Sequence, residues 1–297
     1  MASELPTITS ALGATHRAAR ATATASQGAC GAIGSLCAVT ERIHLDFDGS
    51  IATITNDNPE KHNAFDDDMD LRLFEILEEL GQHPEVRAVI WRGEGKSFSS
   101  GRDVGSIGNS KVDLSHHELM RRGHRGIQQL WELDAVVIVA CKGWVMGGSF
   151  QRALLCDLRI ASDDAKFRLP ETTYGVIPDT GGVAVLYEMC GHGVVSDMVL
   201  TGRVLTAAEA LTHGIVSRVV AADELDATAR EIAEQVAAAP AVTIKMAREV
   251  IRHLSVPQIR TSMSDEMIYQ TFINRSDDVA EMRAARAENR PPRYTGS

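Results

Sequence analysis

The residues best suited to chemistry lie in one stretch, residues 147–182, which begins with a glycine pair and contains an isolated carboxylate after a proline. Glu171 follows that proline, while Gln151 precedes it and Asp179 comes later. A glutamate can take up and release protons, whereas a glutamine only forms hydrogen bonds near neutral pH. Glu171 is therefore a candidate for proton chemistry, and Gln151 is a neutral residue where a second acid could stand.

Two glycine-bearing segments complete the candidate site. "FSSGRDV" (98–104) follows an expected strand ending at Trp91, and "GWVMGGSF" (143–150) follows one ending at Ala140. Ligands bind beyond the carboxyl ends of parallel strands, and glycine lets the backbone approach them closely. Gly148 also begins an expected helix, where free N–H groups favour an anion. Two amides meeting at one oxygen would form an oxyanion hole; two plain tight turns are the alternative.

The role of Asp179 has two interpretations. Its carboxylate could form a pair with Glu171, or it could cap the helix expected from "TGGVAVL", because aspartate is a favoured N-cap residue. The two roles do not exclude each other, and the sequence leaves both open.

The elements that must position these residues alternate between strand and helix. Strands are expected at 51–55, 86–91, 136–140, 158–161 and 215–220, and helices at 66–81 and 150–156, with a capping box at Thr206 and Glu209. The tail from Asp223 reads as helical, with Pro240 and Pro257 as breaks. The fold class is therefore α/β with a helical C-terminal portion. We expect a core over 41–230 and a helical segment over 231–297.

The first 40 residues differ in composition from the rest. They are rich in Ala, Ser and Thr, contain Arg17 and Arg20, and have Glu4 as their acidic residue. Such a segment is typical of a transit peptide or of a disordered extension. No apolar core of the secretory type is present, and we expect the disordered extension.

Charge and cysteine usage exclude several classes of function. The net charge of -10 disfavours binding to nucleic acid or to an anionic membrane. No stretch has the roughly 18 uninterrupted apolar residues of a spanning helix. The five cysteines form no CxxC pair, which indicates reduced thiols and neither zinc nor a disulfide framework. "GEGKS" (93–97) is no P-loop, because Ile90 stands where that motif has glycine.

Several motifs together resemble the crotonase superfamily, the enoyl-CoA hydratase/isomerase family. In order they are "NPEKHNAF", "KSFSSGRDV", "KGWVMGGSFQRALLCDLRIASDDAKFRLPETTYGVIPDTGG", "LTGRVLTAAEALTHGIVSRVV" and "ENRPPRYT", spanning Ile43 to Thr295. The resemblance implies a spiral of ββα repeats with a helical trimerisation segment, assembled as a homotrimer or a dimer of trimers. It also implies a cytoplasmic enzyme of fatty acid metabolism. Its substrate would be an acyl-CoA thioester, with coenzyme A as part of the substrate and no separate metal or redox cofactor.

The resemblance also assigns roles to residues. The backbone amides of Arg102 and Gly148 would hold the thioester oxygen, and Glu171 matches the second of two hydratase glutamates. Gln151 falls where the first glutamate stands, and Asp179 falls where some isomerases have a catalytic acid. The Arg102 side chain would point toward a CoA phosphate or narrow the site. The residues expected around the CoA nucleotide are Lys61, His62, Ala64, Ser100, Asp103 and Val104.

These matches favour one-base proton transfer, as in a double-bond isomerase, over full hydratase activity. A non-catalytic acyl-CoA-binding homologue is the alternative, and RNA binding is disfavoured by the acidic charge. The acyl group is not specified, although the polar 105–125 loop, expected to cover the acyl pocket, hints at a compact or polar one.

Overall fold

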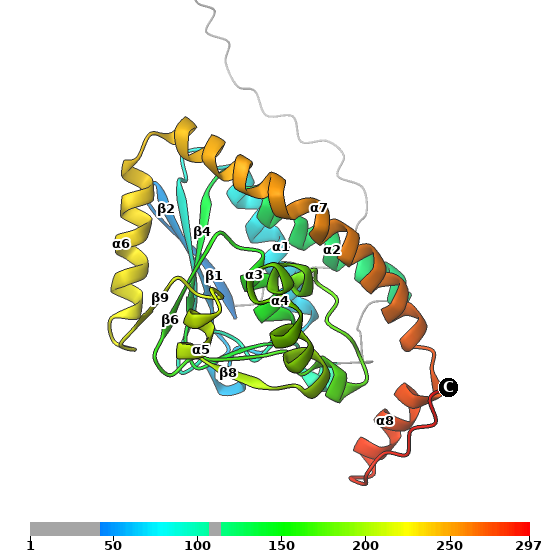
Figure 1. The fold of residues 1–297 in the computed structure, drawn as a ribbon. Coiled ribbons are helices and arrows are strands. Elements are labelled where there is room, and N and C mark those ends of the chain that lie inside the picture. Colours follow the sequence, from blue (N-terminus) through cyan, green and yellow to red (C-terminus); the bar gives the residue numbers. More distant parts are fainter. Residues whose placement is uncertain (1–41, 107–113) are drawn as a thin grey trace, which may run out of the picture. The chain divides into compact units, whose positions relative to one another are not determined.

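The computed structural model describes residues 42–106 and 114–297, which belong to one compact unit, Val39–Ser297 (Figure 1). The segment expected to be a disordered extension, residues 1–40, lies outside the described residues. So does part of the expected acyl-pocket loop, residues 107–113.

A six-stranded sheet forms the centre of this unit. The strand order is β1-β2-β3-β4-β6-β9; β1 is antiparallel to β2 and the remaining neighbours are parallel. Every residue of β4 is buried, as expected for a parallel strand covered on both faces. The strands are β1 (Ile43–Asp48), β2 (Ile51–Asn56), β3 (Ala88–Gly93), β4 (Val136–Cys141), β6 (Leu158–Ser162) and β9 (Arg218–Val220).

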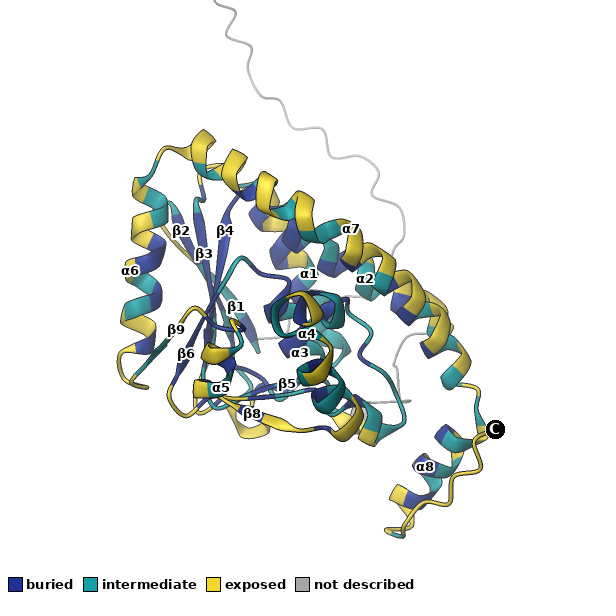
Figure 2. Cartoon of the chain, in the orientation of Figure 1, coloured by how far each residue is buried: buried dark blue, intermediate teal, exposed yellow. Residues whose placement is uncertain are grey.

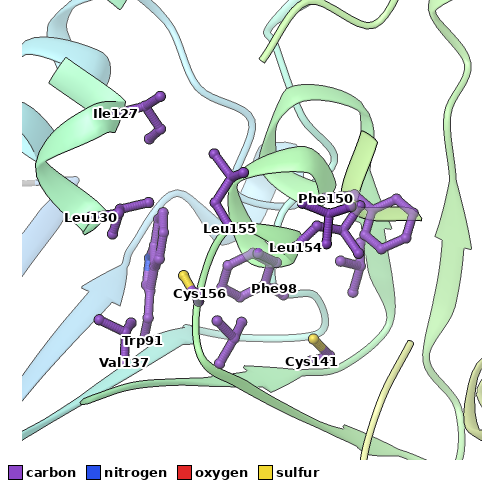
Figure 3. Close-up of a cluster of buried hydrophobic side chains, with 14 of the residues drawn as sticks. Trp91, Phe98, Ile127, Leu130, Val137, Cys141, Phe150, Leu154, Leu155 and Cys156 are labelled. Carbon is purple, nitrogen blue, oxygen red and sulfur yellow. The ribbon is translucent and has the colours of Figure 1, made fainter. Parts of the chain in front are cut away.

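Helices cover both faces of the sheet. On one face, α6 (Leu225–Ala238) packs Leu225 and Ala229 against Ile90 and Ile138. The other face carries the larger cluster, to which α1 (Asp67–Gly81), α2 (His116–Glu132) and α3 (Gly147–Leu154) contribute. Figure 3 shows Trp91 and Val137 of the sheet beside Ile127 and Leu130 of α2. The expected boundary between residues 230 and 231 falls inside α6.

A second, three-stranded sheet lies next to the candidate site. It contains β5 (Trp144–Met146), β7 (Lys166–Arg168) and β8 (Val204–Thr206) in that order, and α5 (Ala207–Thr212) follows β8 with the expected capping box. Because β5 leads directly into α3, this sheet fixes the point at which the glycine pair begins the helix.

Helix α3 is also anchored at its C-terminus. Arg159 of β6 is buried, and its Nη1 donates to the carbonyl of Cys156 at 2.7 Å and to that of Ala153 at 3.2 Å. Its Nε donates to the Ile215 carbonyl at 2.7 Å. An arginine that binds the last carbonyls of a helix satisfies acceptors that the helix cannot satisfy itself.

Two expectations about the helices are wrong. The polar 105–125 stretch is a loop only in part, since α2 begins at His116 and is started by a capping box of Ser115 and Glu118. Pro257 does not break the tail, because α7 runs from Ala241 to Ile273 with this proline inside it. Pro257 lacks the N–H that would bond to the carbonyl of His253, and the His253 side chain is exposed, so water can satisfy that carbonyl.

Helix α4 (Gly182–Thr201) is apolar, and α8 (Asp277–Ala287) follows α7. Within the part of the chain that the structure describes, α4 alone has the length and composition of a membrane-spanning helix. However, Gly191 has non-helical backbone angles inside it, and its buried Leu186 and Met198 belong to the main core cluster. These contacts identify α4 as a packed helix of this unit.

Candidate active site

Glu171 lies at the centre of the candidate site. It begins the short 3-10 helix η3 (Glu171–Tyr174) directly after Pro170, and it is buried. Its Oε1 accepts a hydrogen bond from Gln151 Nε2 at 2.9 Å, whereas its buried Oε2 has no partner among the described residues. Burial and, to a smaller extent, the charge of Asp179 raise the pKa of Glu171 to about 7. Such a carboxyl group can act as acid and base near neutral pH.

Gln151 joins Glu171 to the loop that precedes α4. Its Nε2 donates to Glu171, and its Oε1 accepts from the backbone N–H of Thr180 at 2.9 Å. The side chain is fully buried on α3. Gln151 therefore orients the carboxylate itself. One amide hydrogen and one lone pair remain for the expected contact with a water or a substrate.

The two candidate oxyanion-hole loops are in contact. Gly101 has a φ of 85°, and a Cβ placed on it would come within 2.7 Å of the Met146 carbonyl oxygen and 3.4 Å of Gly147 Cα. Only glycine fits such a close approach at this backbone angle. A Cβ on Gly147 would in turn lie 3.4 Å from Glu171 Oε1. The loop before Arg102, the start of α3 and the carboxylate thus form one continuous wall.

The amides of Arg102 and Gly148 lie on this wall. Phe65 donates to the carbonyl of Gly101 and accepts from Asp103, which leaves the Arg102 N–H between them unused. Gly148 occupies the first turn of α3, where N–H groups lack an intrahelical acceptor, and a Cβ on it would meet nothing within 4 Å. Neither N–H donates to another residue in the described part of the chain. Both are free to bind an oxygen.

Two serine hydroxyls tie these loops together. Ser99 Oγ lies 2.8 Å from Ser149 Oγ and 2.6 Å from the Asn63 carbonyl, and it accepts from the Gly101 N–H at 3.1 Å. Both serines are buried. Because Ser149 follows Gly148, this contact fixes the two candidate amides relative to each other.

The Arg102 side chain points toward α1. It forms ion pairs with Asp67 and, at 2.8 Å, with Asp70 in the first turn of that helix. Arg152 Nη2 lies 2.8 Å from the other oxygen of Asp70, and its guanidinium stacks over the Phe65 ring. Two carboxylates of α1, those of Asp67 and Asp70, therefore hold the Arg102 side chain against that helix, and its contact with a CoA phosphate stays a prediction.

Asp179 lies close to Glu171 but is not a helix cap. The N-cap of α4 is Gly181 and no side chain caps the helix, so the capping interpretation is wrong. His124 Nε2 lies 2.6 Å from the Asp179 carbonyl. Burial raises the pKa of Asp179, and the positive charges of His124 and Arg152 partly oppose this effect. The Asp179 carboxylate thus interacts electrostatically with His124, Arg152 and the Glu171 carboxylate.

The residues expected to bind CoA come together from two segments. Ser100 N donates to the His62 carbonyl at 2.8 Å, and Ser100 Oγ donates to the Lys61 carbonyl at 3.0 Å. Lys61 Nζ donates to Asp103 Oδ2 at 2.7 Å, and this bond is the largest cause of the lowered pKa of Asp103. Ala64 is buried beside them, while Val104 is 36% exposed.

A pocket of about 290 Å³ opens beside His62. Trp144, Lys96 and Lys166 are among its lining residues, and Lys166 Nζ lies over the Trp144 ring at 5.4 Å from its centre. An aromatic ring and lysines suit a ring and a phosphate, whereas the carboxylates of Asp163 and Asp164, which also line the pocket, oppose a phosphate.

The mainly parallel sheet, the smaller sheet beside it and the helical C-terminal segment agree with the crotonase fold of solved enoyl-CoA hydratases. The chain belongs to the enoyl-CoA hydratase/isomerase family, whose family model matches residues 46–297. This identification confirms the expected family and fold class.

Known proteins of this family match most of the chain. The carnitinyl-CoA dehydratase of Escherichia coli O157:H7 is 34% identical over 263 residues, which cover 87% of this chain and 100% of that protein. The enoyl-CoA hydratase/isomerase of Pseudoalteromonas atlantica T6c superimposes with a TM-score of 0.78 at 27% identity, covering 86% of this chain and 100% of the other. An enoyl-CoA hydratase/carnithine racemase of Magnetospirillum magneticum gives a TM-score of 0.68 at 27% identity, covering 87% and 97%.

Several residues at the site were not expected from the sequence. They include Ser99, Ser149 and Arg152, and also Glu266 and Gln270, which reach the 175–181 loop from α7. Glu266 and Gln270 are four residues apart, which places them on one face of a helix. Two polar residues at this spacing on the face that carries the apolar residues are the signal in the sequence that could have identified them.

Proposed function

We propose that the protein binds an acyl-CoA thioester and moves a proton at the carbon next to the thioester carbonyl. The N–H groups of Arg102 and Gly148 bind the thioester oxygen, where negative charge develops when that carbon loses a proton. Glu171 takes up the proton and returns it. The observation that carries the proposal is the free, buried Oε2 of Glu171, on a group whose pKa lies at about 7.

The form of proton transfer that fits this site best is migration of a double bond. Glu171 removes a proton from one carbon, the electron pair moves through the enolate, and the same carboxyl group returns the proton to another carbon. One acid suffices, which agrees with Gln151 standing in hydrogen-bond contact with Glu171. A glutamine cannot accept the proton that a second base would take.

Reversible loss of water is the second candidate. The name of the carnitinyl-CoA dehydratase relative and the effect of Asp179 on Glu171 favour it. In this reaction Glu171 would remove the proton next to the carbonyl and Asp179 would protonate the departing hydroxyl group. The acyl group would then carry a hydroxyl group on the second carbon from the carbonyl.

Three variants test the proposal with a panel of 2-enoyl-, 3-enoyl- and 3-hydroxyacyl-CoA thioesters. Removing the carboxylate in Glu171→Gln should lower kcat by about a thousandfold while thioester binding persists. Gln151→Glu should increase water addition relative to double-bond migration, and Asp179→Asn should lower water addition selectively. Thioester binding without turnover by the wild type would instead favour a non-catalytic acyl-CoA-binding homologue.

We propose that the CoA nucleotide binds along Lys61, His62, Ala64, Ser100, Asp103 and Val104. Their arrangement along two adjoining segments supports this placement. Lys61 would exchange Asp103 for a phosphate, and no separate cofactor is required. Lys61→Met should therefore raise KM for the thioester with little change in kcat.

We also propose that the chain assembles as a homotrimer or a dimer of trimers in the cytoplasm. An exposed apolar stripe on α7, formed by Val242, Met246, Val250 and Leu254, supports the assembly (Figure 2). The free thiols of Cys141 and Cys156 suit a reducing compartment.

A further inference from the structure

In the loop between η3 and α4, residues 175–181, Gly175 and Val176 donate to backbone carbonyls of η3, whereas three later N–H groups donate to side chains. Ile177 N donates to Gln270 Oε1 at 2.9 Å, and Gly181 N donates to Glu266 Oε2 at 2.8 Å. Thr180 N donates to Gln151 Oε1 at 2.9 Å. A fourth side chain, that of His124 on α2, lies 2.6 Å from the Asp179 carbonyl. The path of this loop is therefore largely set from outside, and two of these four side-chain anchors belong to α7.

Glu266 and Gln270 are one helical turn apart on α7, so both face the loop, and both are buried. Close packing reinforces their hydrogen bonds. A Cβ placed on Gly181 would lie 2.7 Å from Ile259 Cγ2 and 2.8 Å from Met263 Cγ, and the φ of Gly181 is 77°. Any other residue type would be strained at this backbone angle and would displace the side chains of Ile259 and Met263.

The second oxygen of Glu266 is also used. Its Oε1 accepts from Ser262 Oγ at 2.7 Å. Burial raises the pKa of Glu266 to about 7, and the charges of Asp179 and Asp265 also raise it. Since Asp179 raises the pKa of both Glu171 and Glu266, its side chain is electrostatically coupled to both carboxyl groups.

We propose that Glu266 and Gln270 are positioning residues for the active site. They hold the 175–181 loop and thereby place Asp179 and the Thr180 N–H that orients Gln151. This inference rests on the proposed function, because it assigns their effect to the placement of Glu171.

A chain of contacts transmits the effect. If the loop shifts, the Gln151 side chain loses its hydrogen bond from the Thr180 N–H. The side-chain amide of Gln151 can then turn, and it no longer fixes the orientation of the Glu171 carboxylate. A displacement of about 1 Å in a reacting group can cost about a hundredfold in rate. Neither α7 residue contacts Arg102 or Gly148, so thioester binding should change much less than turnover.

The test compares Glu266→Met, Gln270→Met and Glu266→Gln. Methionine resembles both side chains in length but removes the strong oxygen acceptor, whereas Glu266→Gln keeps an oxygen for the Gly181 N–H and a donor for Ser262. Asp265→Asn is the matched control, because Asp265 is the neighbouring exposed carboxylate on α7.

We expect Glu266→Met and Gln270→Met to lower kcat by about tenfold or more, with KM changed less than about threefold. Glu266→Gln and Asp265→Asn should stay within about threefold of wild type. Wild-type kcat in Glu266→Met overturns the inference, and so does a loss confined to KM. An equal loss in Glu266→Gln overturns it too, since the acceptor would then not be what matters.

Amide hydrogen exchange separates this inference from the proposed function. Exchange at Ile177 and Gly181 should become faster in the methionine variants and remain slow in Asp265→Asn. If the wild type turns over no thioester, the proposed function fails. If exchange at Ile177 and Gly181 is unchanged in the methionine variants, the α7 contacts do not hold the loop, whatever the activity is. Should Glu266→Met not fold, Gln270→Met carries the same comparison.

Discussion

At the scale of single residues, the pKa of Glu171 gives the most direct prediction. A reaction that begins with proton removal requires the ionised carboxylate, and its pKa of about 7 lies well above the usual 4.5 because the group is buried. We expect kcat/KM to rise by about tenfold per pH unit below the pKa and to level off above it. The pH profile should be measured with a substrate that binds equally well across the range. A profile that is flat from pH 5 to 8 would contradict the role of Glu171 as base.

Asp179 should set the position of that profile. Its negative charge raises the pKa of Glu171, so Asp179→Asn should move the acid limb of the profile to lower pH. An unchanged limb in Asp179→Asn would show that this side chain carries no charge in the free enzyme.

The contact between Ser99 and Ser149 leads to a prediction about the two candidate amides. Ser149→Ala and Ser99→Ala each remove the hydroxyl contact between the loops. Each should lower kcat by about tenfold, and the double variant should lose little more than either single variant. Losses that multiply in the double variant would show that the two hydroxyls act separately.

Local motifs and the family resemblance together pointed to part of this candidate site. Glu171, Gly148 and Arg102 stand in short glycine-bearing motifs, whose local geometry is set by nearby residues. The role of Glu266 could not be predicted from a local motif, because its carboxylate accepts a hydrogen bond from Gly181, which lies far away along the chain. Such a contact depends on how α7 packs, and packing is a property of the whole fold.

At the scale of elements, local signals located most strands and helices, and their ends were less well defined. The expected helix at 66–81 is α1 with Asp66 as its N-cap, since the three following acids and the apolar spacing agree. The strand expected at 86–91 begins two residues later, at Ala88. The short strands β5, β7 and β8 gave no periodic pattern, because three residues are too few to show alternation.

The packing of α1 on α2 depends on one glycine. A Cβ on Gly126 would lie 2.3 Å from Cδ1 of Phe74, so the two helices touch where no side chain fits. Gly126→Ala should lower the free energy of unfolding by about 1–3 kcal/mol through overpacking, measured by chemical denaturation. Gly123→Ala on the same helix is the control, since a Cβ there meets nothing within 4 Å. Equal stability of the two variants would contradict the contact.

At the scale of the whole molecule, buried carboxyl groups should make stability depend on pH. Glu171 and Glu266 have pKa values of about 7 in the folded protein and about 4.5 when unfolded. Between these values the folded state binds more protons, so their contribution lowers the free energy of unfolding as pH rises. Glu266→Gln should therefore become more stable relative to wild type from pH 5 to pH 8. A constant difference in denaturation midpoint over this range would contradict the raised pKa.

The proposed assembly leads to a prediction about the apolar stripe on α7. Val250→Asp together with Leu254→Asp should reduce the mass measured by light scattering to that of a smaller assembly, because charge is costly in a buried interface. Phe47→Asp, which places the same charge on β1, should leave the mass unchanged. A wild-type mass in the double variant would locate the interface elsewhere.

The anchoring of the 175–181 loop by α7 also has a consequence for protein synthesis. All six strands of the central sheet and Glu171 leave the ribosome before Glu266 and Gln270 do. The sheet can begin to form while the chain is still growing, but the loop gains its last two anchors only when α7 is nearly complete. The active site therefore matures only after all strands of the central sheet have been synthesised. Stalled chains that end before Glu266 should protect the strands from proteolysis while leaving residues 175–181 open to cleavage.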